Sequence, residues 1–444
     1  MTLPAIEIPS LRPSLLDAPF PGTELPDLPA ALDEVRQWID AAEEPLGDGA
    51  SRWHAWPDRP EFTPIYGPVS LNTGAAGIAW YANAATALDP AHAARASRAA
   101  AYLRGAWRDH ADDVYFDLPG TGLGHYGGLA GIASVFVGLG DRETAVAILD
   151  EILRRTGVTG GRPFGWTGSN ALLGDGGIVI TLVDASAKLG EPRYLAAAVT
   201  AGLGILAEER PDGSWPGVSA SSFGMSDDIA LEGFELGTIG IGYVFAKLAV
   251  ATGDPRFAQA ATRAAAHVAG KSTVVGDAAV IARTGGDYSF GYCTGSSGVI
   301  RSFVGVFRAT GDPDHLEWAL RFGRGILRSG VPGRQTRGNA YVFHQCCGSA
   351  AVLESFVGLW RETGDPLWLR AAQAQADDLL IRSIADARGR RWYSEAHILP
   401  TGTLKAEVGH QVGASGIALA LLHLHQALQP DTSGATPRLP DDPF

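Results

Sequence analysis

Long apolar runs are absent from this chain of 444 residues, and no stretch approaches the roughly 18 to 20 apolar residues that a bilayer-spanning helix needs. The N-terminal segment lacks both the basic and the continuous apolar stretch of a secretory signal, so we expect a cytoplasmic protein without a membrane span. Basic residues are also in deficit, with 35 Lys and Arg against 48 Asp and Glu. Because phosphate neutralisation needs a basic face, this deficit argues against a nucleic-acid partner.

Cysteine is scarce as well, with only three in the chain, and two of them are adjacent. Three cysteines cannot form a disulfide framework, so they are expected to be free thiols or metal ligands. The composition is otherwise that of a globular protein, because 46% of the residues are hydrophobic and only 19% are charged.

The strongest positive feature is an internal Gly-x-x-Gly repeat. Its seven copies occupy residues 74–77, 128–131, 174–177, 237–240, 295–298, 348–351 and 413–416, and Ala351 replaces the last glycine of the sixth copy. First glycines are separated by 46 to 65 residues, which is long enough for two helices and two loops.

A second landmark follows most copies. Gly-Asp-Pro or Gly-Glu-Pro occurs at 190–192, 253–255, 311–313 and 364–366, and its acidic residue always lies 17 positions after the first glycine of the copy. Glycine typically ends one helix, whereas Asp and Pro typically begin the next. Each repeat is therefore predicted to be a hairpin of two antiparallel helices.

The two helices of a hairpin differ in character. The first helix of the fifth repeat is apolar nearly all round, whereas the second has an apolar stripe and one wet face. Neither terminal repeat resembles a polar cap, so closure of the ring is favoured over an open solenoid. The predicted fold is all-α, an (α/α)7 toroid over residues 65–429. It is preceded by a segment, 1–64, with one outer helix over 29–43, and followed by a disordered tail, 430–444.

All three cysteines lie just before a Gly-x-x-Gly, where corresponding residues should surround one mouth of the ring. Cys293 is two residues before Gly295, and Cys346 and Cys347 immediately precede Gly348 on the next inner helix. Three thiols at neighbouring helix starts suit a tetrahedral soft-ligand ion, most plausibly Zn²⁺ with an open fourth position. A reactive thiol, a redox pair or ordinary packing of buried cysteines are the alternatives.

Seven such hairpins, with Cys-x-Gly-x-x-Gly in the fifth and Cys-x-Gly in the sixth, resemble the lanthionine synthetase C-like family, the cyclases of lanthipeptide biosynthesis. The resemblance implies an (α/α)7 toroid and a Zn²⁺ ion held by Cys293 and by the pair before Gly348. In the family that pair is Cys-His, so Cys346-Cys347 resembles a three-cysteine variant.

The resemblance further implies formation of (methyl)lanthionine thioethers in a ribosomally made precursor peptide. A cysteine thiol of the peptide would bind the zinc and add to dehydroalanine or dehydrobutyrine. The implied partners are the dehydrated precursor peptide and a maturation enzyme such as a dehydratase, a lyase or a kinase-like enzyme.

The family pattern of acid and base residues is not kept. Leu236, Gly124 and Ser289 stand where family members commonly have His, Asp and Arg. Candidate substitutes at the same mouth are predicted from the repeat register, and they are His125, Glu235, His344 and His410. Each could instead cap a helix or lie in a solvated loop. Predicted substrate contacts are Tyr292, Tyr126, Asn72 and Gln411.

Two other functions are compatible with the same residues. The first is addition of glutathione or another external thiol to dehydroamino acids. The second is a non-catalytic zinc-containing scaffold that binds a peptide or a maturation enzyme. Glycosidase chemistry is disfavoured because no pair of acidic residues occurs at the mouth.

Overall fold

The structure is a computed structural model. It describes residues 27–59, 64, 66–157, 163–223, 231–282, 288–333, 342–395, 404–429 and 436–444. Residues 1–26 and 430–435, which belong to the predicted terminal segments, lie outside the described residues.

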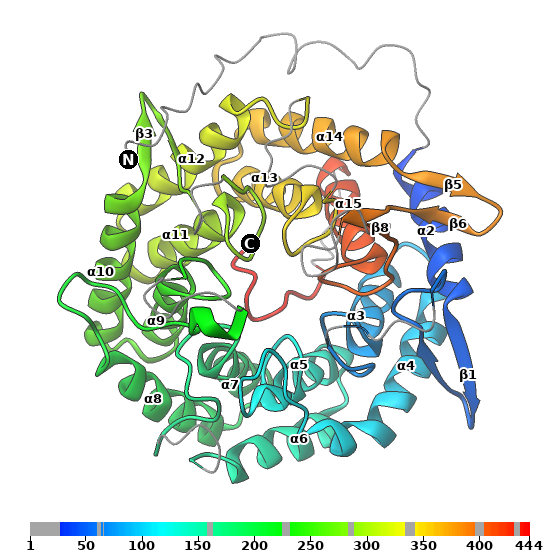
Figure 1. Cartoon of the computed structure of the whole chain (residues 1–444), viewed down its shortest axis with the longest axis horizontal. Helices are drawn as coiled ribbons and strands as arrows, with labels where there is room; N and C mark the ends of the chain where they lie inside the picture. Colours follow the sequence, from blue (N-terminus) through cyan, green and yellow to red (C-terminus); the bar gives the residue numbers. More distant parts are fainter. Residues whose placement is uncertain are drawn as a thin grey trace.

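The helices form two concentric rings, and the chain winds once around the axis (Figure 1). The inner ring consists of α3 (Ala75–Ala85), α5 (Leu129–Leu139), α7 (Asp175–Leu189), α9 (Thr238–Thr252), α11 (Ser296–Thr310), α13 (Ser349–Thr363) and α15 (Ala414–Leu428). Each inner helix contacts the next one, and α15 contacts α3, so the ring is closed. The predicted all-α (α/α)7 toroid is thereby confirmed.

The outer ring packs around the inner one. It consists of α4 (His92–Ala106), α6 (Arg142–Arg154), α8 (Pro192–Leu206), α10 (Pro255–Lys271), α12 (Pro313–Arg328), α14 (Pro366–Ile381) and α2 (Leu28–Ala41). Helix α2 corresponds to the outer helix predicted over 29–43, and it packs on α15. The seventh hairpin is therefore built from the first and last described helices of the chain.

Strands occur only as small antiparallel pairs in the described part of the chain. They are β1 (Glu43–Gly47) with β2 (Ala50–Trp53), β3 (Thr273–Val275) with β4 (Ala278–Val280), β5 (Ile384–Asp386) with β6 (Gly389–Arg391), and β7 (Ser394–Glu395) with β8 (Leu404–Lys405). Most lie at the edge of the outer ring (Figure 1).

The predicted chemistry of the turns is observed. Gly253 ends α9 in the left-handed region with φ of 68°, where a side chain would be strained. Asp254 then caps α10 by accepting a hydrogen bond from the backbone of Arg256, and Pro255 is the first helical residue. The same sequence of events joins α11 to α12 and α13 to α14.

The second glycine of the repeat permits a close approach between helix and loop. A Cβ added to Gly240 would lie 1.8 Å from the backbone oxygen of Phe234, in the loop that precedes the same helix. At Gly416 the corresponding distance, to the oxygen of His410, is also 1.8 Å. In the six repeats that keep it, this glycine therefore lets the loop pack directly against the first turn of its inner helix.

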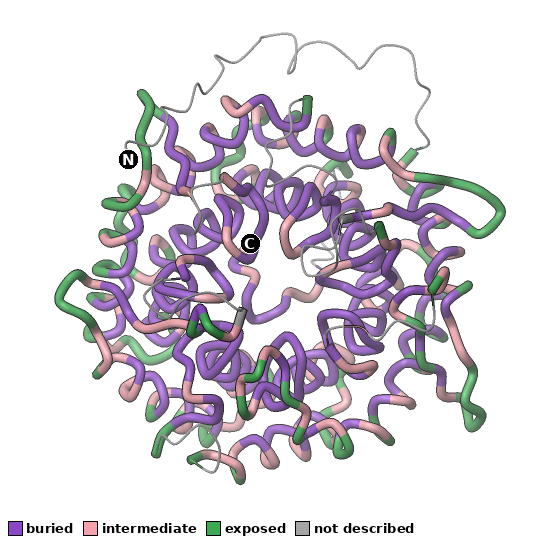
Figure 2. The backbone as a smooth tube through the Cα atoms, viewed as in Figure 1, coloured by how far each residue is buried: buried purple, intermediate pink, exposed green. Residues whose placement is uncertain are grey.

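Burial follows the two rings (Figure 2). The inner helices are buried almost throughout, whereas the outer helices expose one face. None of the described helices combines the length and the apolar character that crossing a bilayer would require.

The C-terminal residues differ from the sequence prediction of a disordered tail. Residues 436–444, which we call the C-terminal segment, run across the inside of the ring (Figure 1). Leu439 is 6% and Asp441 3% exposed. Composition could not reveal this because proline-rich, charged sequence is typical of disorder unless a surface of the same molecule binds it.

Replacing Gly240 with Ala is expected to destabilise the protein by about 1 to 3 kcal/mol, because the added methyl group overlaps the backbone of Phe234. Urea unfolding measures the change as a shift of the midpoint. Gly105→Ala in α4 is the matched control, because its added Cβ meets no atom within 4 Å. Equal midpoints for the two variants would contradict the proposed role of the repeat.

Candidate functional site

The loops before the inner helices are joined to one another by backbone hydrogen bonds. The donor and acceptor residues lie two positions before the first glycine of each repeat, except that Leu173 lies one before its glycine. The bonds run from Leu173 N to Glu235 O (2.9 Å), Glu235 N to Cys293 O (3.2 Å), Cys293 N to Cys346 O (2.9 Å), Cys346 N to Gln411 O (2.7 Å), Gln411 N to Asn72 O (3.0 Å) and Asn72 N to Tyr126 O (3.0 Å).

These six bonds, which we call the loop ladder, connect all seven repeats. The bond between Gln411 and Asn72 joins the seventh repeat to the first. Because backbone hydrogen bonds fix main-chain position and direction, the ladder holds the corresponding residues of successive repeats in one register. Those residues include most of the predicted site.

The three thiols meet, as the repeat register predicts. Cys293 Sγ lies 3.0 Å from Cys347 Sγ, which lies 3.3 Å from Cys346 Sγ, and all three sulfurs are within 4.8 Å of one another. A tetrahedral zinc ion with Zn–S bonds of about 2.3 Å separates its sulfur ligands by about 3.8 Å. The separations of 3.0 and 3.3 Å are somewhat shorter than this value, so the donor set fits a single Zn²⁺ ion if the side chains move slightly apart.

Without a cation the cluster disfavours thiolates. Hydrogen bonds with Cys293 and Cys347, together with burial, raise the pKa of Cys346 well above its ordinary value. For Cys293, the hydrogen bond with Cys346 lowers the pKa, but the contact with Cys347 and burial outweigh it and raise it. Three crowded thiols of this kind need a positive ion to become ligands. Cys293 is 8% exposed and the other two are partly exposed, so the cluster is reachable.

Glu235 is the predicted acid–base residue that lies beside the thiols. Its Oε1 atom is 4.0 Å from Cys346 Sγ, and the side chain is 7% exposed. Burial, followed by the charges of Cys293 and Asp441, raises the pKa of Glu235 well above its ordinary value. The protein thus favours a protonated carboxyl group next to the sulfur cluster.

Two predicted substrate contacts, Tyr126 and Tyr292, instead contact each other. Their hydroxyls are 2.5 Å apart, and Tyr292 donates to Asp441 Oδ2 at 2.5 Å. Both tyrosines are buried. Their phenol groups are therefore engaged within the protein, and Tyr292 immediately precedes Cys293.

The three predicted histidines occupy different surroundings. His125 is buried, with Nδ1 3.0 Å from Thr181 Oγ1 and Nε2 3.7 Å from Asp441 Oδ1. His344 Nδ1 accepts a 3.4 Å hydrogen bond from the backbone of Cys347, so it shapes the cysteine loop. His410 is buried, and burial lowers its pKa to about 4. A neutral His410 at pH 7 is a weaker proton donor than the sequence suggested.

A small cavity of about 30 Å³ adjoins these residues. Tyr292, His410 and Gln411 line it together with inner-helix side chains and the C-terminal segment. Asn72 does not line this cavity, and it belongs to the loop ladder through its backbone. Asn72 and Gln411 are both buried.

Sequence reasoning missed three charged groups in the interior. Arg301 and Glu354 lie on α11 and α13, each six residues after the first glycine of its repeat, and Asp441 lies in the C-terminal segment. All three are at most 6% exposed. The signal that could have found the first two is a charge inside a helix that is otherwise apolar on every side.

His410→Gln is expected to reduce the loss of stability on acidification. The folded-state pKa of His410, about 4, is below its unfolded value, so the unfolded state takes up the proton first as the pH falls. The contribution of His410 to the free energy of unfolding is complete above about pH 6.5. It falls by about 3 kcal/mol as the pH decreases towards 4. Urea unfolding of both proteins at several pH values gives the two slopes.

His54→Gln is the control, because His54 is exposed in the outer part of the molecule. Equal slopes between pH 6.5 and 4 for wild type and His410→Gln would show that His410 is not held neutral by burial.

Solved structures show that the fold is shared. The nisin cyclase is 14% identical, with a TM-score of 0.58, and the match covers 80% of this chain and 88% of that one. The alpha-1,2-mannosidase from Trichoderma reesei is 11% identical, with a TM-score of 0.57 and 95% of each chain covered. At these identities the likeness shows the toroid alone, since one fold hosts different chemistries.

Among curated proteins nothing matches the chain. The sequence profile of the lanthionine synthetase C-like proteins, however, matches residues 66–434. This range spans all seven repeats and the three cysteines. The chain belongs to the lanthionine synthetase C-like family.

Proposed function

We propose that this protein is a zinc-dependent cyclase that forms (methyl)lanthionine thioethers in a dehydrated precursor peptide. The observation that carries the proposal is the meeting of Cys293, Cys346 and Cys347 at the partly exposed mouth of the ring, with all sulfurs within 4.8 Å. Family membership supports a peptide substrate of this kind.

The reaction joins a peptide cysteine to the β-carbon of dehydroalanine or dehydrobutyrine. A new C–S bond forms, the thiol loses its proton, and the α-carbon gains one, so no oxidant or reductant is consumed. When bound, Zn²⁺ supplies the chemistry that an unperturbed thiol, with a pKa of about 8.5, lacks at neutral pH, because coordination favours the thiolate.

The protein itself has two tasks in this reaction. The loop ladder holds the ligands Cys293 and Cys346 on adjacent repeats, through the 2.9 Å bond between their backbones. Glu235, 4.0 Å from Cys346 Sγ, is the residue best placed to hold a proton for the α-carbon. It takes the place of the acid and base residues that family members carry at positions 124, 236 and 289.

Cys293→Ala is expected to abolish stoichiometric zinc binding and to slow thioether formation by at least about 100-fold, because it removes the ligand from the fifth repeat. Metal analysis of the purified protein gives the zinc content. Mass spectrometry after thiol alkylation counts the free cysteines of a dehydrated peptide. Thr262→Ala, at an exposed position of the outer helix α10, is the control and should keep both properties.

The same assay separates the alternatives. Addition of glutathione, seen as a mass increase of the peptide, without ring formation would indicate an external-thiol transferase. Full zinc occupancy with no change in any dehydrated peptide tested would indicate a scaffold. Wild-type protein without zinc would refute the proposed site.

Glu235→Gln is expected to keep the zinc and to slow addition by about 100-fold or more, because the amide cannot supply the proton. Zinc content and rate are measured on the same preparation. Glu232→Gln, three residues earlier and in contact with His267 of α10, is the control. A rate within twofold of wild type for Glu235→Gln would assign the proton to another group.

A further inference from the structure

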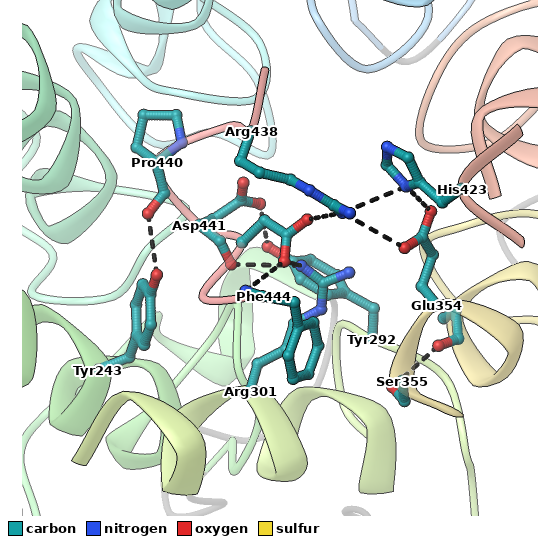
Figure 3. Close-up of polar contacts among 12 residues, drawn as sticks. Tyr243, Tyr292, Arg301, Glu354, Ser355, His423, Arg438, Pro440, Asp441 and Phe444 are labelled. Carbon is teal, nitrogen blue, oxygen red and sulfur yellow. Dashed lines mark hydrogen bonds and ion pairs between the residues drawn. The ribbon is translucent and has the colours of Figure 1, made fainter. Parts of the chain in front are cut away.

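The C-terminal segment crosses the inside of the ring and is bound at several points (Figure 3). Tyr243 on α9 donates a 3.0 Å hydrogen bond to the backbone oxygen of Pro440. Arg301 on α11 donates a 3.3 Å bond to the backbone oxygen of Asp441. A Cβ on Gly358 of α13 would meet the ring of Phe444 at 2.4 Å. Three consecutive inner helices therefore hold the segment.

Charged residues of the C-terminal segment form ion pairs with oppositely charged residues of the inner helices. Arg438 Nη1 lies 2.7 Å from Asp442 and 3.7 Å from Glu354 of α13. Asp442 in turn lies 3.5 Å from Arg301, and Glu354 also pairs with His423 of α15 at 2.6 Å. An unpaired buried charge is costly, so the segment and the helices stabilise each other's charged groups.

One residue of the segment reaches towards the sulfur cluster. Asp441 Oδ2 accepts the hydroxyl of Tyr292 at 2.5 Å and lies 3.4 Å from the hydroxyl of Tyr126. Tyr292 immediately precedes Cys293, and its backbone nitrogen donates to the oxygen of Cys346 at 2.8 Å. The carboxylate is thus connected to two of the three thiol-bearing residues through one tyrosine.

The other carboxylate oxygen of Asp441, Oδ1, faces the loop that contains His125. Asp441 Oδ1 is 3.7 Å from Nε2 of His125, the residue after Gly124. Burial raises the pKa of Asp441, but the interactions with His125 and Arg301 outweigh it and hold the pKa at about 2. The group is therefore an ionised acceptor, well suited to bind hydroxyl and imidazole donors.

We propose that the C-terminal segment is a component of the metal centre, and that Asp441 is a positioning residue that orients Tyr292 and thereby the Cys293 ligand. This inference rests on the proposed zinc site. Partners that orient metal ligands from outside the coordination shell commonly change metal affinity by about 10- to 100-fold. In this protein such a partner comes from residues 436–444, and Asp441 lies 94 positions after Cys347.

The test measures metal affinity and stability separately. Full-length wild type, Asp441→Ala, Asp441→Asn and Asp442→Ala are titrated with Co²⁺, whose thiolate absorption reports binding, and their zinc affinity follows by competition with a chelator. Thermal unfolding of the same metal-free samples reports stability. Asp442 is the matched control, because it is the neighbouring carboxylate, partly buried, and pairs with Arg301 and Arg438.

We expect Asp441→Ala to weaken metal binding by about 10-fold or more, and Asp441→Asn, which keeps one acceptor oxygen, to restore most of it. Asp442→Ala should lower the unfolding temperature but change metal affinity by less than about threefold. Equal metal affinities for the two alanine variants would overturn the proposal, because the segment would then act through stability alone.

Tyr292→Phe provides a second route if Asp441→Ala folds poorly. It removes only the hydroxyl, so it should weaken metal binding as Asp441→Ala does, and the double variant should be no weaker than either single one. Additive losses would overturn the proposal. Wild type that binds no Co²⁺ or Zn²⁺ would refute the metal site and this inference together, whereas equal affinities in all variants would refute the role of Asp441 alone.

Discussion

The loop ladder is the interaction on which the remaining structure of the site depends. An array of helical hairpins fixes the height of its inner helices only loosely, because ridges and grooves of packed helices allow several registers. Six backbone hydrogen bonds between neighbouring loops remove this freedom. They hold Glu235, Cys293 and Cys346 side by side on three successive repeats. In the six repeats that keep a second glycine, this glycine lets the loop lie directly on the first helical turn.

The toroid could be predicted because local sequence motifs mark where its helices begin and end. Gly-Asp-Pro at 253–255, 311–313 and 364–366 predicts where three pairs of helices meet, and the structure places a left-handed glycine, a capping aspartate and an initial proline there. The seventh outer helix was foreseen within two residues at either end. These predictions succeed because turn and cap preferences depend on neighbouring residues alone. The small antiparallel strands were not foreseen, since each contains only two to five residues.

The sulfur cluster was also predictable, because the repeat converts sequence position into height and angle around the ring. The contacts between side chains could not be predicted in this way. Tyr126 and Tyr292 are 166 residues apart, and no periodicity indicates that their hydroxyls meet each other and Asp441. The segment that contains Asp441 has the composition of a disordered tail. Its order depends on Arg301 and Glu354, whose burial in turn depends on the closed ring. Such mutual dependence is visible only in three dimensions.

The pairing of α2 with α15 has a consequence for biosynthesis. The seventh hairpin joins residues 28–41 to residues 414–428, so the ribosome makes its second half long after its first. Until residues 389–428 leave the ribosome, the buried side of α2, with Val35, Trp38 and Ile39, lacks its partners β6 and α15. Contacts over so large a sequence separation form slowly. The nascent chain therefore carries an unsatisfied apolar helix for most of its synthesis, which is a natural target for chaperones that bind exposed apolar segments.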